Sequence, residues 1–275
     1  MDSRALQLTL IGVDFTSAPR RLKPIIAAQG HLNGKVVELQ RLEAMADWPA
    51  FEALLARPGP WLGAFDFPFG LPREAVVDLA WPTSWPALVR HCVRLGKPGF
   101  RAALDAYRET RAIGQRYAHR ATDSPARSHS PLKLVNPPVG LMFLEGAPRL
   151  LAAGVSLPGM HAADPRRMAV EAYPGLIARS ITPESYKSDD KRKQNAARRD
   201  TRARIVGALC DGRTANGLRL VLSEAHRTTL IDDASADHLD ATLALLQAAA
   251  CALAGAPHFG LPANLDPLEG WIAGA

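Results

Sequence analysis

The stretch that decides the fold is LQLTLIGVDFTSAP, residues 6–19. Most of its first eight residues are apolar and several are β-branched, which predicts a β-strand. Because a nearly all-apolar strand is typical of a sheet covered on both faces, we expect it to be central. The strand ends at Asp14, and Pro19 closes the turn that follows. We therefore expect the Asp14 carboxylate at the edge where open α/β sheets bind their ligands.

The composition is that of a folded protein with a large core. The chain has 275 residues, of which 47% are hydrophobic. Three widely spaced cysteines and histidines without ligand spacing predict neither a disulfide framework nor a zinc site, as in a reducing compartment. The chain has no apolar run of membrane-spanning length and no signal-like start. We expect a cytoplasmic protein with no membrane contact, folded as one domain over residues 1–275.

The next elements deliver a second acid to the same edge. Runs at residues 24–29 and 35–42 flank the turn Asn33-Gly34, so the first three strands are expected to form an antiparallel meander. Residues 47–57 have helical spacing with Asp47 as the N-cap. A fourth strand, residues 61–65, ends at Asp66. A right-handed crossover places it parallel to the first strand, which brings Asp66 beside Asp14.

The middle of the chain predicts an insertion. Residues 73–165 are rich in Pro and Gly and lie between the fourth strand and a fifth one at residues 168–173, which contains Glu171. Within the insertion we expect an Arg-rich helix over residues 101–120 and a loop over 121–138. A segment this long is typical of a functional region such as a lid. The expected fold is α/β, with a mixed five-stranded sheet flanked by helices: strands one to three antiparallel, then parallel strands four and five.

A late helix adds two more acids. Residues 235–254, SADHLDATLALLQAAACALA, are apolar on both faces after the first turn, which predicts a buried helix. Ser235 or Asp233 is the expected N-cap. Asp237 and Asp240 lie three residues apart on one side of the first turn. Burying two unpaired carboxylates is costly, and a metal ion would neutralise them.

A basic segment precedes that helix. Residues 187–204 contain eight Lys or Arg and three Asp, in a chain of net charge +6. We expect a helix from near Ser188 or Asp189 to Leu209, followed at residues 218–223 by a strand or a helix start. Such a segment is either a phosphate-binding surface or a solvated helix face. The side chains expected to contact phosphate are Lys187, Arg192, Arg198, Arg199 and Arg202.

Taken singly, each acid has a local explanation, as a turn former, a helix-dipole partner or half of an ion pair. Taken together, Asp14, Asp66, Asp237 and Asp240 predict one cluster at one sheet edge. All-oxygen ligand sets of this kind suit Mg²⁺ or Mn²⁺. Two such ions would support hydrolysis of a phosphodiester bond.

The motifs GVDFTSAP, FDFPFGLP, VEAYPG and DHLDATLALLQAAA, in this order, resemble domain-of-unknown-function family 429, whose members are described as predicted nucleases with an RNase H-like fold. The order of the elements is similar to that of the Holliday-junction-resolvase branch of the fold. The resemblance runs from Leu10 to Gly255, with a poorly matched middle.

The resemblance implies that Asp14 and Asp66 are the metal ligands of the first and fourth strands and that Asp237 and Asp240 are the paired acids of the last helix. Asp66 stands where the resolvases carry the longer Glu. Glu171 matches the acid of an E-x-Y-P motif, and either binds metal or orients Lys187 or an arginine by a charge pair. The expected activity is metal-dependent cleavage of RNA or DNA.

Two other classes remain open. The actin-like ATPases and sugar kinases share this fold, but they place a glycine soon after the first-strand aspartate, and Asp14 is followed by Phe-Thr-Ser-Ala-Pro. No P-loop or dinucleotide fingerprint is present either. A non-catalytic protein that binds nucleic acid or a phosphate ligand would keep the basic segment and need no complete metal site.

Overall fold

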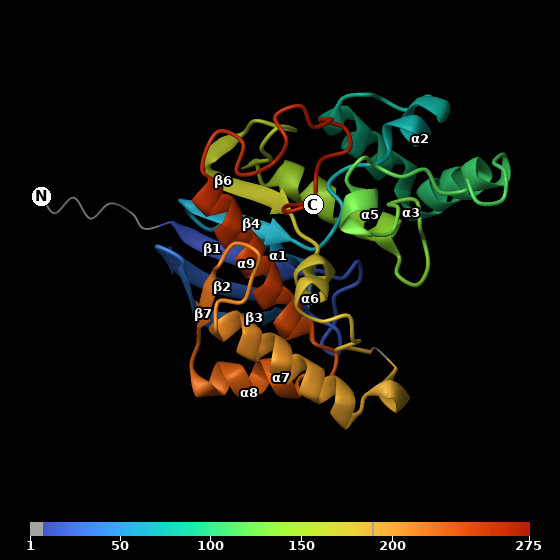
Figure 1. Ribbon diagram of the computed structural model, residues 1–275. Coiled ribbons are helices and arrows are strands. Elements are labelled where there is room, and N and C mark those ends of the chain that lie inside the picture. Colours follow the sequence, from blue (N-terminus) through green and yellow to red (C-terminus); the bar gives the residue numbers. More distant parts are fainter. Residues whose placement is uncertain (1–7, 189) are drawn as a thin grey trace, which may run out of the picture.

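The central strand forms where the apolar run predicts it. The computed structural model describes residues 8–188 and 190–275, and β1 (Thr9–Asp14) lies in the middle of a seven-stranded mixed sheet of order β5-β6-β4-β1-β2-β3-β7 (Figure 1). Residues 6 and 7, included in the predicted strand, lie outside the described residues. Five of the six residues of β1 are buried, as expected of a strand covered on both faces.

The strand pairings around β1 agree with the expected directions. β1 pairs antiparallel with β2 (Ile25–Asn33), and β2 pairs antiparallel with β3 (Val36–Met45), which confirms the meander. On its other side β1 pairs in parallel with β4 (Trp61–Phe65), which in turn pairs in parallel with β6 (Asp164–Glu171). The carboxyl ends of β1, β4 and β6 therefore meet at one edge of the sheet.

The predicted count of five strands was wrong, and so was the order that it implied. β5 (Val155–Ser156) extends the sheet beyond β6, and β7 (Arg219–Val221) extends it beyond β3. Both are edge strands of two or three residues, too short for a period-two pattern to stand out. β7 lies in the stretch for which strand and helix were both open.

Alternating side chains of the strands build a core on each face of the sheet. Ile11 and Val13 pack on the face covered by α1 (Trp48–Leu55), α3 (Trp85–Glu109) and α5 (Val139–Ala152). The predicted cap of α1 is confirmed, because Asp47 accepts a hydrogen bond of 2.9 Å from the amide of Ala50.

Leu10, from the same strand, packs on the opposite face. That face is covered by α6 (Pro174–Ile181), α7 (Ala196–Cys210), α8 (Glu224–Asp232) and α9 (Asp237–Ala254), with α9 crossing the strands (Figure 1). Within the described ranges, no helix is long and apolar enough to cross a membrane.

The insertion is helical, but the helices do not fall where they were predicted. The helix expected over residues 101–120 belongs to α3, which begins at Trp85, is interrupted at Gly96 and ends at Glu109. Trp85, Leu88, Val89 and Cys92 are buried ahead of the predicted start, so packing rather than charge sets where this helix begins. The short helices α2 (Arg73–Asp78) and α4 (Asp123–Ala126) complete the insertion.

Two predicted helix starts were also too early. In the basic segment, a 3₁₀ turn (η1, Lys191–Lys193) precedes α7, which begins at Ala196 with Asn195 as its N-cap; Asp189 lies outside the described residues. The late helix begins at Asp237 rather than Ser235. The predicted N-cap, Ser235 or Asp233, was wrong, because Ala236 occupies that position; the Asp233 carboxylate nevertheless accepts the amide of His238 at 3.1 Å.

Candidate carboxylate site

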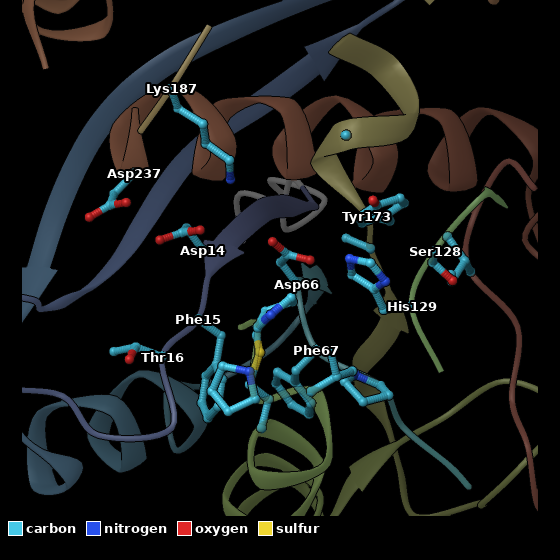
Figure 2. Close-up of a pocket in the computed structure, with 18 of the residues that line it drawn as sticks. Asp14, Phe15, Thr16, Asp66, Phe67, Ser128, His129, Tyr173, Lys187 and Asp237 are labelled. Atoms are coloured by element: carbon cyan, nitrogen blue, oxygen red, sulfur yellow. The ribbon is translucent and has the colours of Figure 1, made fainter. Parts of the chain in front are cut away.

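Parallel pairing brings Asp14 and Asp66 to the same level. Val13 is paired with Phe65, and the amide of Asp66 donates a 2.9 Å hydrogen bond to the carbonyl of Val13. Asp14 directly follows Val13, and Asp66 directly follows Phe65. Because β1 and β4 are neighbouring parallel strands, the two carboxylates lie at the same end of the sheet (Figure 2). This is the convergence that the strand order predicts.

Close packing of α9 on β1 delivers the other two acids. Gly12 has no side chain, and a β-carbon there would lie 2.0 Å from the nitrogen of Leu245 and 2.2 Å from the carbonyl oxygen of Ala241. The backbone of α9 therefore lies directly on β1, one turn beyond Asp237 and Asp240. Asp240 is fully buried.

Each acid of α9 has a cationic partner. Asp240 accepts hydrogen bonds from the ammonium group of Lys187 and, at 2.6 Å, from the hydroxyl of Tyr186. Asp237 forms an ion pair of 3.2 Å with Lys23. Both oxygens of Asp240 are thus engaged by the segment that leads into the basic region.

Burial and mutual repulsion raise the pKa values of three of the acids. The pKa of Asp14 lies well above its usual range, first because of burial and then because of Asp240 and Asp237. Burial raises the pKa of Asp66 to about 7, with Lys187 opposing the shift. Burial also raises the pKa of Asp240, despite its ion pair with Lys187. The site holds more negative charge than its two lysines comfortably balance.

Lys187 is the positive centre of the cluster. Burial alone would lower its pKa, but Asp240, Tyr186, Asp14 and Asp66 together raise it well above the usual range. The side chain is 47% exposed, so its stem meets solvent while the ammonium group faces the acids (Figure 2). Lys187 is therefore charged at all physiological pH values.

The donor set suits a hard cation, although it is not closed around one. Among residues 8–188 and 190–275, no group of three or more His, Cys, Asp or Glu side chains is arranged as a ready metal site. The carboxylates of Asp14 and Asp66 accept no hydrogen bond from those residues. Two unpaired, destabilised carboxylates side by side offer oxygen ligands of the kind that Mg²⁺ and Mn²⁺ prefer.

The acids lie in a pocket of about 610 Å³. One wall comes from the insertion, with His129, Pro138, Val139 and Met142. The opposite wall comes from residues 183–188, between α6 and α7. The floor between them holds the residues that directly follow the two strand acids, Phe15 and Phe67.

Glu171 belongs to a buried ion cluster. Its carboxylate accepts two hydrogen bonds of 2.7 Å from the guanidinium of Arg120 and one of 2.9 Å from the amide of Phe69. Arg120 also pairs with Asp123 at 2.9 Å. Of the roles considered for Glu171, the structure contains the charge pair with an arginine. The pair joins the insertion to the carboxyl end of β6.

Four of the five side chains predicted to contact phosphate are at the acids or at the surface. Lys187 lies at the acids. Arg192 and Arg199 lie at the surface in ion pairs with Asp190 (3.0 Å) and Asp232 (2.7 Å), and Arg198 donates to the carbonyl of Lys193.

Arg202 does not fit the prediction. It is buried, and its guanidinium donates to the carbonyls of Ile231 at 2.7 Å and Tyr186 at 2.8 Å. Because these bonds and its burial keep it from solvent, Arg202 cannot receive a phosphate backbone. It instead ties the segment that carries Tyr186 and Lys187 to α7 and α8.

Sequence reasoning missed four residues of the site. Lys23, Arg120 and Tyr186 pair with acids that are 51 to 214 residues away, so no local pattern marks them. His129 was expected to be a surface or loop residue; it is exposed in a loop, and it also lines the pocket (Figure 2). Only Tyr186 carried a usable signal, through its position next to Lys187.

Comparisons with known proteins add no relative: no family model matches the chain, and neither a curated protein nor a solved structure matches it. The resemblance to domain-of-unknown-function family 429 thus stays a prediction. What is established is an α/β chain with a seven-stranded mixed sheet and an acidic pocket at the carboxyl ends of its central parallel strands.

Proposed function

We propose that the protein is a metal-dependent nuclease that hydrolyses phosphodiester bonds of nucleic acid. The observation that carries the proposal is that Asp14 and Asp66, whose carboxylates accept no hydrogen bond from the described residues, line one pocket and have raised pKa values. Such excess negative charge is the state in which a divalent cation binds most favourably.

The topology supports an RNase H-like fold. The strands β3, β2, β1, β4 and β6 lie side by side in this order, the first three antiparallel and the last three parallel. Acids at the ends of β1 and β4 and at the start of the late helix α9 match the motifs that resemble family 429. Because a fold hosts many functions, the proposal depends on the site rather than on this likeness.

Asp14, Asp66, Asp237 and Asp240 would hold Mg²⁺ or Mn²⁺. The bound ions would activate a water molecule and stabilise the leaving oxygen. Of the four acids, Asp14 and Asp66 are ready to bind, while Asp237 and Asp240 are engaged by Lys23 and Lys187.

Lys187 has a second role in this scheme. Its ammonium group neutralises the acids in the absence of other cations. If the acids held divalent ions, this ammonium group would be free to contact a phosphate oxygen. A lysine is suited to this because a flexible stem carries a compact charge. Tyr186 stays on Asp240 and keeps that carboxylate in place.

One observation favours a second candidate, a non-catalytic nucleic-acid-binding protein. Lys187 and Lys23 already pair with two of the four acids, Asp240 and Asp237, so these two need no metal ion. In that case the pocket would bind its ligand through the lysines, and Asp14 and Asp66 would titrate rather than coordinate.

Calorimetric titration with Mn²⁺ distinguishes the two candidates. We expect wild-type protein to bind Mn²⁺, the Asp14→Asn/Asp66→Asn double variant to lose the binding, and Asp190→Asn, a surface change, to keep it. We expect the same order in Mn²⁺-dependent cleavage of labelled RNA and DNA. Cleavage that survives in the double variant would refute the proposal, and a folded wild-type protein that neither binds Mn²⁺ nor cleaves would favour the non-catalytic candidate.

A further inference from the structure

Both strand acids are followed by phenylalanine. β1 continues as Asp14-Phe15 and β4 as Asp66-Phe67, so parallel pairing brings the two phenylalanines together as it does the two acids. Their ring centroids are 4.5 Å apart, with the planes tilted by 47°. Figure 2 shows the carboxylates on one side of the strand ends and the two rings on the other.

The phenylalanines continue into an apolar wall. Phe15 and Phe67 line the pocket but are only 5% and 2% exposed, whereas Pro138, Val139 and Met142 of the insertion line it and are half-buried. The pocket therefore has two chemically distinct parts. Charged side chains surround the acids, and apolar side chains surround the space beside them.

The dimensions of the pocket match one small ligand. Its volume of about 610 Å³ lies within the range of pockets that enclose a ligand of nucleotide size. Two of the acids that line it, Asp14 and Asp237, are each only 8% exposed.

A base-paired duplex cannot easily place one base in the apolar part of the pocket. Its bases are stacked and paired, and turning one of them out costs a few kcal/mol. A single strand pays little of this cost, and its exposed bases pack well on apolar and aromatic side chains. The apolar wall next to the acids is placed where the base or sugar beside a bound phosphate would lie.

We infer that the pocket binds an unpaired nucleotide of a single-stranded nucleic acid, with its phosphate at the acids and its base against Pro138, Val139 and Met142, beside the buried rings of Phe15 and Phe67. This inference rests on the proposed function for the role of the acids. It adds the substrate class: single-stranded segments are preferred to duplex.

Binding of a labelled oligothymidylate, measured by fluorescence anisotropy in the presence of Ca²⁺, tests the inference, with the same strand annealed to oligoadenylate as the comparison. We expect the single strand to bind about tenfold or more tightly than the duplex. The variants Met142→Gln and Val139→Gln exchange apolar for polar surface with little change of size. Each should weaken single-strand binding about threefold to tenfold.

Val135→Gln is the matched control, because Val135 lies in the same segment, is 57% exposed and is not among the residues that line the pocket. It should bind the single strand like wild type. Using two pocket variants keeps the test valid if one of them fails to fold.

The possible results separate the inference from the proposed function. Equal binding of single strand and duplex, or pocket variants that behave like Val135→Gln, would overturn the inference, whether or not the protein binds Mn²⁺. Single-strand preference that depends on Met142 and Val139 would support it. If that preference is found in a protein that neither binds Mn²⁺ nor cleaves, the pocket assignment stands and the nuclease proposal fails.

Discussion

A β-carbon on Gly12 would lie 2.0 Å from the backbone nitrogen of Leu245, so the central strand and the last helix touch backbone to backbone. This contact sets the distance between Asp14, two residues after Gly12, and Asp240, five residues before Leu245. Burial raises the pKa of Asp14, and Asp240 raises it further because the two carboxylates are held this close. The electrostatics of the site therefore depend on a residue that has no side chain.

We expect Gly12→Ala to be strongly destabilising. The new methyl group would meet backbone atoms of α9, which cannot move without lifting the helix from the sheet, so the loss should be about 3 kcal/mol or more. Urea unfolding measures it. Gly207→Ala is the control, because a β-carbon at Gly207 in α7 meets nothing within 4 Å and should stabilise the helix by about 0.5–1 kcal/mol. A Gly12→Ala protein as stable as wild type would show that α9 does not rest on β1.

Lys187→Met should raise the pKa of Asp66 further. Lys187 opposes the effect of burial on this carboxyl, so removing its charge leaves burial and the other acids unopposed. Carbon-detected NMR titration of the aspartate carboxyl groups measures the change. Arg192→Met, which removes a charge paired with Asp190 at the surface, should leave the Asp66 titration unchanged. An unchanged titration in Lys187→Met would place the ammonium group away from the acids in solution.

In the absence of divalent cations, ionisation of the buried Asp66 should lower the stability of the protein as the pH rises. The pKa of Asp66 is raised from 3.8 to about 7, so the folded state holds this proton more tightly than the unfolded chain does. The resulting stabilisation is complete below pH 3.8 and is lost as the pH rises to about 7. Asp66→Asn removes the effect, since its amide does not ionise.

Thermal unfolding of both proteins in a metal-free buffer checks this. The Tm of Asp66→Asn minus that of wild type should increase steadily as the pH is raised through this window, by about 2–4 °C for each kcal/mol of stabilisation that wild type loses. The comparison cancels the other groups that titrate in the same range. A difference that stays constant with pH would contradict the raised pKa.

Glu171→Gln should lower the stability of the fold and leave Mn²⁺ affinity almost unchanged. The substitution leaves the buried Arg120 guanidinium with Asp123 as its remaining carboxylate partner, and breaking a buried pair typically costs about 3–5 kcal/mol. Urea unfolding measures the loss, and Mn²⁺ affinity of the folded protein should stay close to wild type. Arg192→Gln breaks an exposed pair and should leave the stability close to that of wild type. Lost Mn²⁺ binding with unchanged stability would make Glu171 a metal ligand instead.

Local patterns identified most of the elements that carry the site. The apolar run into Asp14, the Asn33-Gly34 turn, and the parallel return of the fourth strand predicted the centre of the sheet and the meeting of Asp14 with Asp66. Each of these signals lies within a few residues along the chain. The start of α3 and the short edge strands were missed because they depend on packing against distant parts of the chain.

The sequence by itself determined which acids end the central strands and open the last helix, because strand and helix periodicity depends on neighbouring residues. Tertiary structure alone decided how those acids are balanced: Lys187 and Tyr186 on Asp240, Lys23 on Asp237, and Arg120 on Glu171. It also turned Arg202 from an expected phosphate ligand into a buried anchor. The physical reason is that charge and burial act through space, between residues that the chain order keeps far apart.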